Sequence, residues 1–277
     1  MIRVTRKSLR ALIVIGSCLA PSMFLGARPV FALAVSSSQP IIRHELAPGE
    51  TIQGTIEVSS HQDDPLHLRI YLEDWRYKPT GDGEKDFGPP QTMPRSAAGW
   101  ISFYPSEVDL PGRGKAVIDY TIRVPENSSV EGEYVAVLFL EAVMGEGPSE
   151  ASADKPSAMV KFAARLGSLI YVDVKNTVRK EGRFRDIVVN RASLAEPPSV
   201  KAKLANEGNA VLLCEGAFHV MDEHNVITAR GQLPTRWMWP GDQVPVEAPL
   251  KEGSAGTLIM TYDCGEDLVI VEELPLS

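Results

Sequence analysis

The sequence predicts an all-β protein made of two β-sandwiches in tandem. Apolar residues alternate with polar ones at a period of two, which suits half-buried strands, and no segment carries a sustained helical stripe. Pro, Gly and Asn turn signals recur roughly every ten residues in both halves. After a predicted signal peptide, 277 − 34 = 243 residues remain. That length suits two sandwiches of about 100 residues each.

The segment Ser106–Tyr134 shows the strand pattern most clearly. Turns are expected at Pro111-Gly112 and around Pro125. Between them lies an alternating strand, and Val135–Leu140 then forms an apolar run typical of a central strand. This order is typical of immunoglobulin-like sandwich domains, which hold and bind other molecules and rarely catalyse.

Residues 1–34 have the features of a cleaved signal peptide. A basic start precedes the apolar Ala11–Leu25, and Ala32-Leu33-Ala34 provides a cleavage site after Ala34. We therefore expect a periplasmic or secreted protein. Lipidation at Cys18 is an alternative, although Arg10 leaves a short apolar stretch before that cysteine. No second apolar segment is long enough for a membrane span.

The expected mature chain is acidic. The full sequence has 28 Lys and Arg and 36 Asp and Glu, and residues 1–34 contain five of the basic residues and none of the acids. The net charge after cleavage is therefore 23 − 36 = −13. Such a charge disfavours nucleic acid and anionic membranes as partners and favours solubility.

The first domain is predicted over residues 38–167. Its expected strands are Ile41–Leu46, Thr51–Ser59, Leu66–Tyr77, Trp100–Tyr104, Ser106–Leu110, Lys115–Val124, Tyr134–Val143 and Met159–Leu166. Two long interruptions are predicted as loops. Lys78–Ala98 is rich in Gly and Pro and could carry function, and Met144–Pro156 is a Gly-, Ser- and Glu-rich surface loop.

The second domain is predicted over residues 168–277, with Ser168–Val174 as a continuous strand that links the domains. Its other expected strands are Phe184–Leu194, Ser199–Ala205, Val211–Met221, Val226–Gln232, Gln243–Leu250, Thr257–Asp263 and Leu268–Glu273. Cys214 and Cys264 remain after signal cleavage, on strands expected to be neighbours. An oxidising compartment favours a disulfide between them over free core cysteines.

The sequence contains little that indicates catalysis. It has no nucleophile elbow, no zinc-protease helix motif and no phosphate-binding glycine loop. His219 and His224 form a candidate metal pair, but on a strand their odd spacing directs them to opposite faces. The acidic segment Thr80–Asp86 lacks the full spacing of an EF-hand loop. We therefore predict no enzyme activity, no metal site and no cofactor.

Two groups of aromatic residues have alternative interpretations. Trp75, Tyr77, Trp100, Phe103 and Tyr104 surround the first long loop, and Trp237-Met238-Trp239 precedes a Pro-Gly turn. Packing of the sandwiches is the favoured interpretation. The alternative is an exposed platform for protein or glycan, as in a cell-envelope binding or scaffold module.

Several of these motifs together resemble a known family. Arg43 precedes Pro48-Gly49-Glu50, Tyr104-Pro105-Ser106 leads to Pro111-Gly112, and Val124-Pro125 leads to Gly132-Glu133-Tyr134. Over about Ile41–Val174 this order is similar to the first domain of the periplasmic pilus-assembly chaperones, the PapD-like family of two immunoglobulin-like domains. The second half resembles exported β-sandwich proteins less specifically.

The resemblance implies a chaperone that donates an edge strand to a pilin-like subunit or another secreted surface protein. The implied donor strand is Ser157–Leu166, with Val160, Phe162, Ala164 and Leu166 on one face and Lys161 and Arg165 on the other. Arg43, together with Lys161 or Arg165, would bind the subunit's C-terminal carboxylate. Ala164 is small for such a strand, and the Lys78–Ala98 insertion is long. Self-association through the exposed edge is also expected.

Overall fold

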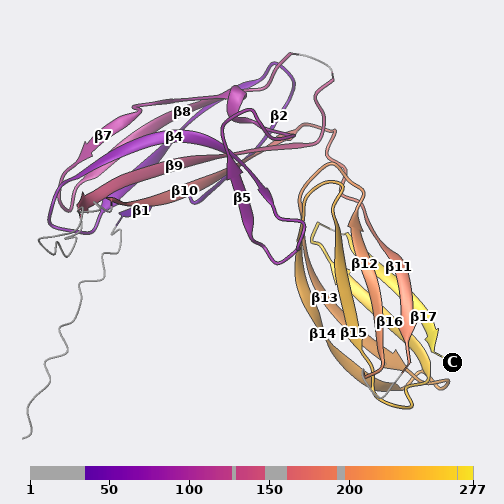
Figure 1. Ribbon diagram of the computed structural model, residues 1–277. Helices are drawn as coiled ribbons and strands as arrows, with labels where there is room; N and C mark the ends of the chain where they lie inside the picture. Colours follow the sequence, from indigo (N-terminus) through magenta and orange to yellow (C-terminus); the bar gives the residue numbers. More distant parts are fainter. Residues whose placement is uncertain (1–34, 127–128, 147–160, 192–196, 267, 277) are drawn as a thin grey trace, which may run out of the picture. The chain divides into compact units, whose positions relative to one another are not determined.

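The strands of this protein form two β-sandwiches, each built from two sheets. The computed structural model describes residues 35–126, 129–146, 161–191, 197–266 and 268–276, and the backbone alone over 143–146 and 161–163. Within those ranges, the helical element is a single 3₁₀ turn at Ala98–Trp100, and no helix is long and apolar enough to cross a membrane. Figure 1 shows the strands of both sandwiches. The predicted all-β fold is therefore confirmed.

The first sandwich contains β1 to β10. One sheet has the order β1-β3-β8-β6, with bounds Val35–Ser37, Thr51–Ser60, Lys115–Arg123 and Ile101–Tyr104. The other has the order β2-β10-β9-β4-β5, with β7 also paired to β4, and bounds Ile41–Leu46, Lys161–Val174, Glu133–Glu146, Leu66–Tyr77, Lys85–Gly88 and Glu107–Leu110. Alternate residues of both sheets meet in one core that includes Ile56, Leu68 and Leu138.

The second sandwich contains β11 to β17. Its three-stranded sheet has the order β11-β12-β15, with bounds Gly182–Asn190, Ser199–Asn206 and Gln243–Pro249. Its four-stranded sheet has the order β14-β13-β16-β17, with bounds Ile227–Met238, Leu212–Met221, Gly256–Asp263 and Val269–Leu276. A separate core, with Leu204, Leu212 and Tyr262 fully buried, lies between these sheets.

The boundary between the predicted domains needs a correction. β10 continues past Gly167 to Val174, and Ile170, Val172 and Val174 lie in the core of the first sandwich. The first sandwich therefore ends at Val174 rather than at residue 167. The residues 1–34 and most of the predicted loop Met144–Pro156 lie outside the described residues.

The predicted loop Lys78–Ala98 contains a strand of its own. β5 pairs with the end of β4, from Asp74↔Gly88 to Tyr77↔Lys85. The buried carboxylate of Asp74 also accepts hydrogen bonds from the backbone N–H groups of Thr92 and Met93, at 2.7 and 2.8 Å. This insertion is therefore held against the sandwich by backbone pairing and by one buried acid.

Candidate functional site

The most distinctive surface of the first sandwich is an unpaired stretch of β10. On one side β10 pairs antiparallel with β9 from Lys161 to Asp173, as Figure 1 shows. On the other side β2 pairs parallel with β10 only over Leu169–Val174. Among the described residues, Lys161–Ser168 thus has no strand on that side. The open length is about eight residues, or roughly 26 Å.

The backbone of this open stretch presents hydrogen-bonding groups to solvent. The N–H of Leu169 donates to the carbonyl of Pro40 on the β2 side, at 2.9 Å. Because the groups of a strand alternate in direction, the N–H and C=O groups of Arg165 and Gly167 point toward the same side. An incoming strand could therefore extend the sheet along this stretch. We call Lys161–Ser168 the β10 edge.

Three edge strands of the second sandwich contain prolines. Prolines occur in β14 at Pro234, in β15 at Pro245 and Pro249, and in β17 at Pro275. Proline lacks an N–H and protects exposed edges against unwanted partners. The β10 edge has no proline, although its ladder with β9 shifts register between Lys161 and Phe162.

The structure describes the residues predicted for the donor strand to different extents. Val160 lies outside the described residues, and only the backbone is described for Lys161 and Phe162, which begin β10. Ala164 and Leu166 are half-buried, and Leu166 packs against the core of the first sandwich. The apolar face of the β10 edge therefore continues the interior of the sandwich.

Arg43 lies in β2, beside the paired half of β10. Its Nη1 donates to Glu133 Oε2 at 2.7 Å and to Asp173 Oδ2 at 3.0 Å, and its guanidinium lies 4.3 Å from the centre of the Tyr171 ring. Glu133 Oε1 accepts the backbone N–H of Val211, in the second sandwich, at 3.1 Å. We call Arg43, Glu133 and Asp173 the Arg43 cluster; it carries one more negative charge than positive charge.

Burial determines the electrostatics of this cluster. The Glu133 side chain is 1% exposed and that of Arg43 is 44% exposed. Burial raises the pKa of Glu133, and the attraction of Arg43 and the hydrogen bond from Val211 only partly oppose this. Burial also acts to lower the pKa of Arg43, but Glu133 and Asp173 outweigh it and hold that pKa above its ordinary value. Arg43 therefore stays charged, and it stabilises the charged form of the buried Glu133 carboxylate.

The structure does not bring Arg43 together with its predicted partners. Arg43 is opposite Tyr171 in the β2–β10 ladder. Arg165 is 171 − 165 = 6 residues earlier along β10, which is roughly 20 Å, and Lys161 is farther still. Strand register places Glu133 and Asp173 beside Arg43. The two-residue carboxylate grip stays a prediction.

Arg165 lies instead over an aromatic surface on the outer face of the sheet. Its guanidinium is 4.2 Å from the centre of the Phe139 ring and 5.1 Å from that of Phe87, and it pairs with Glu73 at 3.3 Å. Arg165, Phe87 and Glu73 line an open hollow of 730 Å³, together with Pro89 and Pro90. Arg165 is thus held at the outer rim of the β10 edge.

The tryptophans do not form an exposed platform. Trp75 is 1% exposed, its indole N–H donates to the carbonyl of Ala136 at 3.0 Å, and its ring packs edge-on against Tyr171 and Trp239. Trp239 is buried as well. Trp75, Tyr77 and Trp239 pack the sandwiches as favoured, whereas Tyr104 is 75% exposed. A binding module that uses exposed Trp75 or Trp239 is contradicted by their burial.

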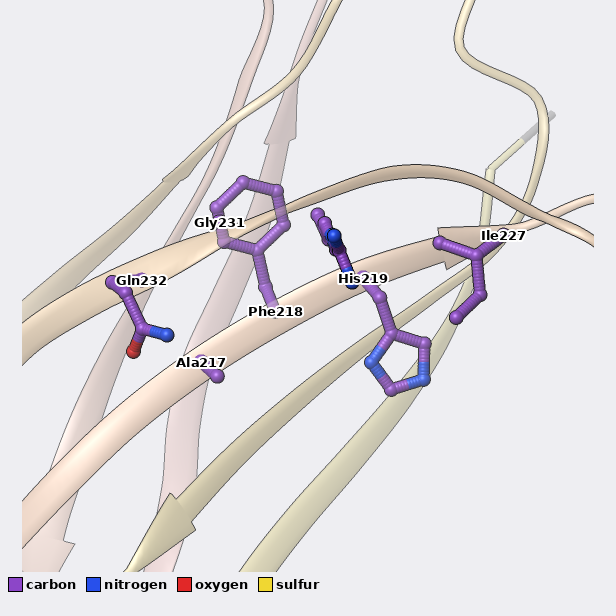
Figure 2. Close-up of a pocket in the computed structure, with 7 residues that line it drawn as sticks. Ala217, Phe218, His219, Ile227, Gly231 and Gln232 are labelled. Atoms are coloured by element: carbon purple, nitrogen blue, oxygen red, sulfur yellow. The ribbon is translucent and has the colours of Figure 1, made fainter.

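The candidate metal residues do not converge. In Figure 2 the rings of Phe218 and His219 lie on opposite sides of β13, and His219 lines a shallow hollow with Ile227 and Gln232. Across the described part of the chain, no group of three His, Cys, Asp or Glu side chains is arranged to hold a metal ion. Asp82 in the acidic segment accepts hydrogen bonds from Thr80 and from the backbone of Glu84, so it organises its own turn.

The predicted disulfide is confirmed. Cys214 in β13 and Cys264, just after β16, are joined by a disulfide, with their Cα atoms 4.0 Å apart. β13 and β16 are neighbours through Glu215↔Asp263. This bond closes a loop with a sequence separation of 50 residues in the second sandwich.

Two members of the Arg43 cluster could not be chosen from the sequence. In the sequence, Glu133 stands out only as part of Gly132-Glu133-Tyr134. Asp173 is only one residue of the strand expected to link the domains. One available signal was the position of Glu133 beside an apolar run that is buried on both faces, where a carboxylate requires a partner. The sequence does not say which of the basic residues is that partner.

Comparison with known proteins gives structural resemblances and no sequence relatives. No family model matches the sequence, and no curated protein matches it. A chain from a chaperone–tip adhesin complex of CFA/I fimbriae biogenesis aligns with 87% of this chain and 99% of its own, at 13% identity and a TM-score of 0.47.

Two further solved structures give the same picture. The class 5 fimbriae chaperone CfaA aligns with 87% of this chain and all of its own, at 14% identity and a TM-score of 0.46. A chain from the Salmonella enterica complex of SafA pilin with the SafB chaperone aligns with 89% and 99%, at 11% identity and a TM-score of 0.42. The chain thus resembles PapD-like fimbrial chaperones remotely, and its function has to be inferred from its own contacts.

Proposed function

We propose that this protein is an exported, non-enzymatic chaperone-like protein that binds pilin-like or other secreted surface subunits by donating the β10 edge to a sheet of the subunit. The observation that carries the proposal is that, within the described ranges, no strand pairs with Lys161–Ser168 on the side where β2 begins only at Ile41. Main-chain hydrogen bonds would supply affinity without demanding one partner sequence.

The side chains of the β10 edge suit an extended partner. Ala164 and Leu166 open toward the core of the sandwich, so alternate apolar residues of the added strand would cover the same core. Each fully buried apolar side chain of that kind contributes about 1.5–3 kcal/mol, less the cost of ordering the partner. A partner that lacks a strand of its own would gain the most from this pairing.

Arg43 enters the proposal as a second contact, for the carboxylate at the end of the partner chain. Nη1 makes the ion pairs with Glu133 and Asp173, and among the described residues no acceptor bonds to Nε or Nη2. The end of the β10 edge at Ser168 is three residues, roughly 10 Å, from the level of Tyr171 and Arg43. Because two carboxylates already neutralise Arg43, we expect edge pairing to supply most of the affinity.

The test compares two substitutions of one residue. Arg165→Ala removes the side chain and keeps the N–H that points to the open side, whereas Arg165→Pro removes both. The processed protein and both variants would be used to capture partners from the native envelope fraction. Hydrogen exchange of the captured complex would then report protection of the Arg165 and Gly167 amides.

We expect the wild type and Arg165→Ala to recover the same small β-rich subunits, with the Arg165 and Gly167 amides protected. Arg165→Pro should recover at least roughly tenfold less, because it removes a main-chain bond and crowds the incoming strand. Circular dichroism and thermal melts of the free proteins check that all three are folded. Equal recovery by the Ala and Pro variants would refute edge pairing.

A further inference from the structure

A single glycine interrupts the outer face of the β10 edge. Gly167 is opposite Phe139 in the β10–β9 ladder, and Phe139 is opposite Tyr71 in the next ladder. A Cβ placed on Gly167 would lie 2.9 Å from Phe139 Cε1 and from Val137 Cγ2. The glycine therefore gives the Phe139 ring the space that a β10 side chain would otherwise occupy.

Arg165 crosses the space above this glycine. Its guanidinium stacks on Phe139, as described above, and reaches Glu73. Glu73 is opposite Val137 in the β4–β9 ladder, whereas Arg165 is opposite Glu141 in the β10–β9 ladder. The side chain therefore leans along the strand from its own position toward the level of Gly167. It remains 41% exposed, and Phe87 beside it is 38% exposed. At the level of Gly167, the rim of the β10 edge therefore presents the planar Arg165 guanidinium, which packs on the Phe139 and Phe87 rings.

We propose that this rim selects the partner strand by requiring an aromatic residue opposite Gly167. The inference rests on the proposed edge pairing, because it concerns the residue that pairing would place there. Directly opposed residues of neighbouring strands have Cβ atoms about 5 Å apart. A large ring at that position would lie beside the Phe139 ring, which occupies the space of the missing Gly167 side chain, and would meet the Arg165 guanidinium.

Two physical effects favour an aromatic ring over other side chains. A ring would add to the cover that Phe139 already gives Gly167, an effect known from cross-strand aromatic–glycine pairs. It also stacks on a guanidinium whose opposite face is already supported by Phe139. A carboxylate would compete with Glu73 for the same guanidinium, and a small residue would not reach that guanidinium.

The test uses synthetic strands, because the natural partner is not needed to measure the preference. The probes are acetylated and amidated eight-residue peptides, with Val at positions that face the core and Thr at positions that face outward. In each peptide, one outward-facing Thr is replaced by Phe, Leu, Ala or Glu, and the series places this replacement at each outward position in turn. The amide end group keeps Arg43 out of the measurement.

Binding to the processed protein would be followed by NMR titration of the Arg165 and Gly167 amides, with intermolecular contacts to fix the register. We expect Phe opposite Gly167 to bind about three- to fivefold more tightly than Ala, the size of an exposed cation–π contact. This preference should vanish in Arg165→Ala and persist in the matched variant Arg123→Ala, whose arginine lies on the opposite sheet and is 65% exposed.

The outcomes separate the two proposals. If no peptide perturbs the amides of the β10 edge at millimolar concentration, edge pairing fails and the aromatic preference fails with it. If peptides bind there but Phe, Leu and Ala bind equally, only the aromatic preference is overturned. A preference for Phe that persists in Arg165→Ala would also overturn it, because the ring would then not depend on Arg165.

Discussion

Replacement of Arg43 by alanine should destabilise the protein at neutral pH and have a much smaller effect in mild acid. The substitution leaves Glu133, with a side chain 1% exposed, without its cation. Breaking a fully buried ion pair costs about 3–5 kcal/mol. Because the Arg43 side chain is 44% exposed, water screens part of the interaction, and we expect about half of that cost, roughly 2 kcal/mol.

The pH dependence follows from the direction of the Glu133 pKa. Burial raises this pKa above its usual value of 4.5 in the folded protein, and Arg43 acts to lower it. A carboxyl group whose folded pKa is raised favours folding fully below the unfolded pKa, and this contribution is lost as the pH rises through the folded pKa. Without Arg43 the folded pKa rises further, so the loss at pH 7 grows and protonation near pH 4.5 relieves it.

Urea denaturation followed by tryptophan fluorescence at pH 7 and pH 4.5 would measure this difference. The double variant Arg43→Ala/Glu133→Gln should recover most of the loss at pH 7, because no buried charge is left alone. Arg123→Ala, which removes an exposed arginine, should change the free energy of unfolding little at either pH. An equal loss for Arg43→Ala at both pH values would show that Glu133 is not the group that depends on Arg43.

Three further results are expected from the structure. Replacing Cys214 and Cys264 by alanine should lower the stability of the second sandwich by about 4 kcal/mol, the chain-entropy value for a separation of 50 residues, as measured by urea denaturation against the oxidised wild type. Trp75→Ala should cost about 3–5 kcal/mol in the same assay, because it empties a fully buried site and leaves the Ala136 carbonyl without its donor. Gly112→Ala should destabilise the first sandwich, because its Cβ would lie 1.7 Å from the Asp63 carbonyl oxygen, and a thermal melt unchanged from wild type would contradict that contact.

Alternating strands were predictable from the sequence, and their ends less so. Ile41–Leu46 and Leu66–Tyr77 form strands with the bounds that their patterns indicate, because turn residues flank both. Met159–Leu166 and Ser168–Val174 were expected as two strands, with the domain boundary at Gly167 between them. Here the glycine is instead required within the strand, where Phe139 occupies the space of its missing side chain. β5, Lys85–Gly88, has no apolar alternation and forms through pairing with β4.

The candidate site was predictable only in part. An edge strand near residue 160 and a basic residue at position 43 followed from the family resemblance and from alternation. The neighbours of Arg43 did not, because Glu133 and Asp173 lie 90 and 130 positions away in the sequence. Such pairs are set by the register of β2 and β9 against β10, and single-residue patterns carry no information about register across long separations.

The division of the first strand segment between two sheets has a consequence for engineering. Val35–Ser37 pairs with β3 in one sheet, and after the short crossing at Ser38–Pro40 the chain joins β10 in the other sheet. The Ser37 and Ser168 hydroxyls, 3.1 Å apart, mark the place where the chain leaves β10 uncovered. The three residues Val35–Ser37 pair in the opposite sheet and therefore do not cover the β10 edge. A redesign that redirects residues 35–40 along β10 would convert a receptive sandwich into a self-contained one.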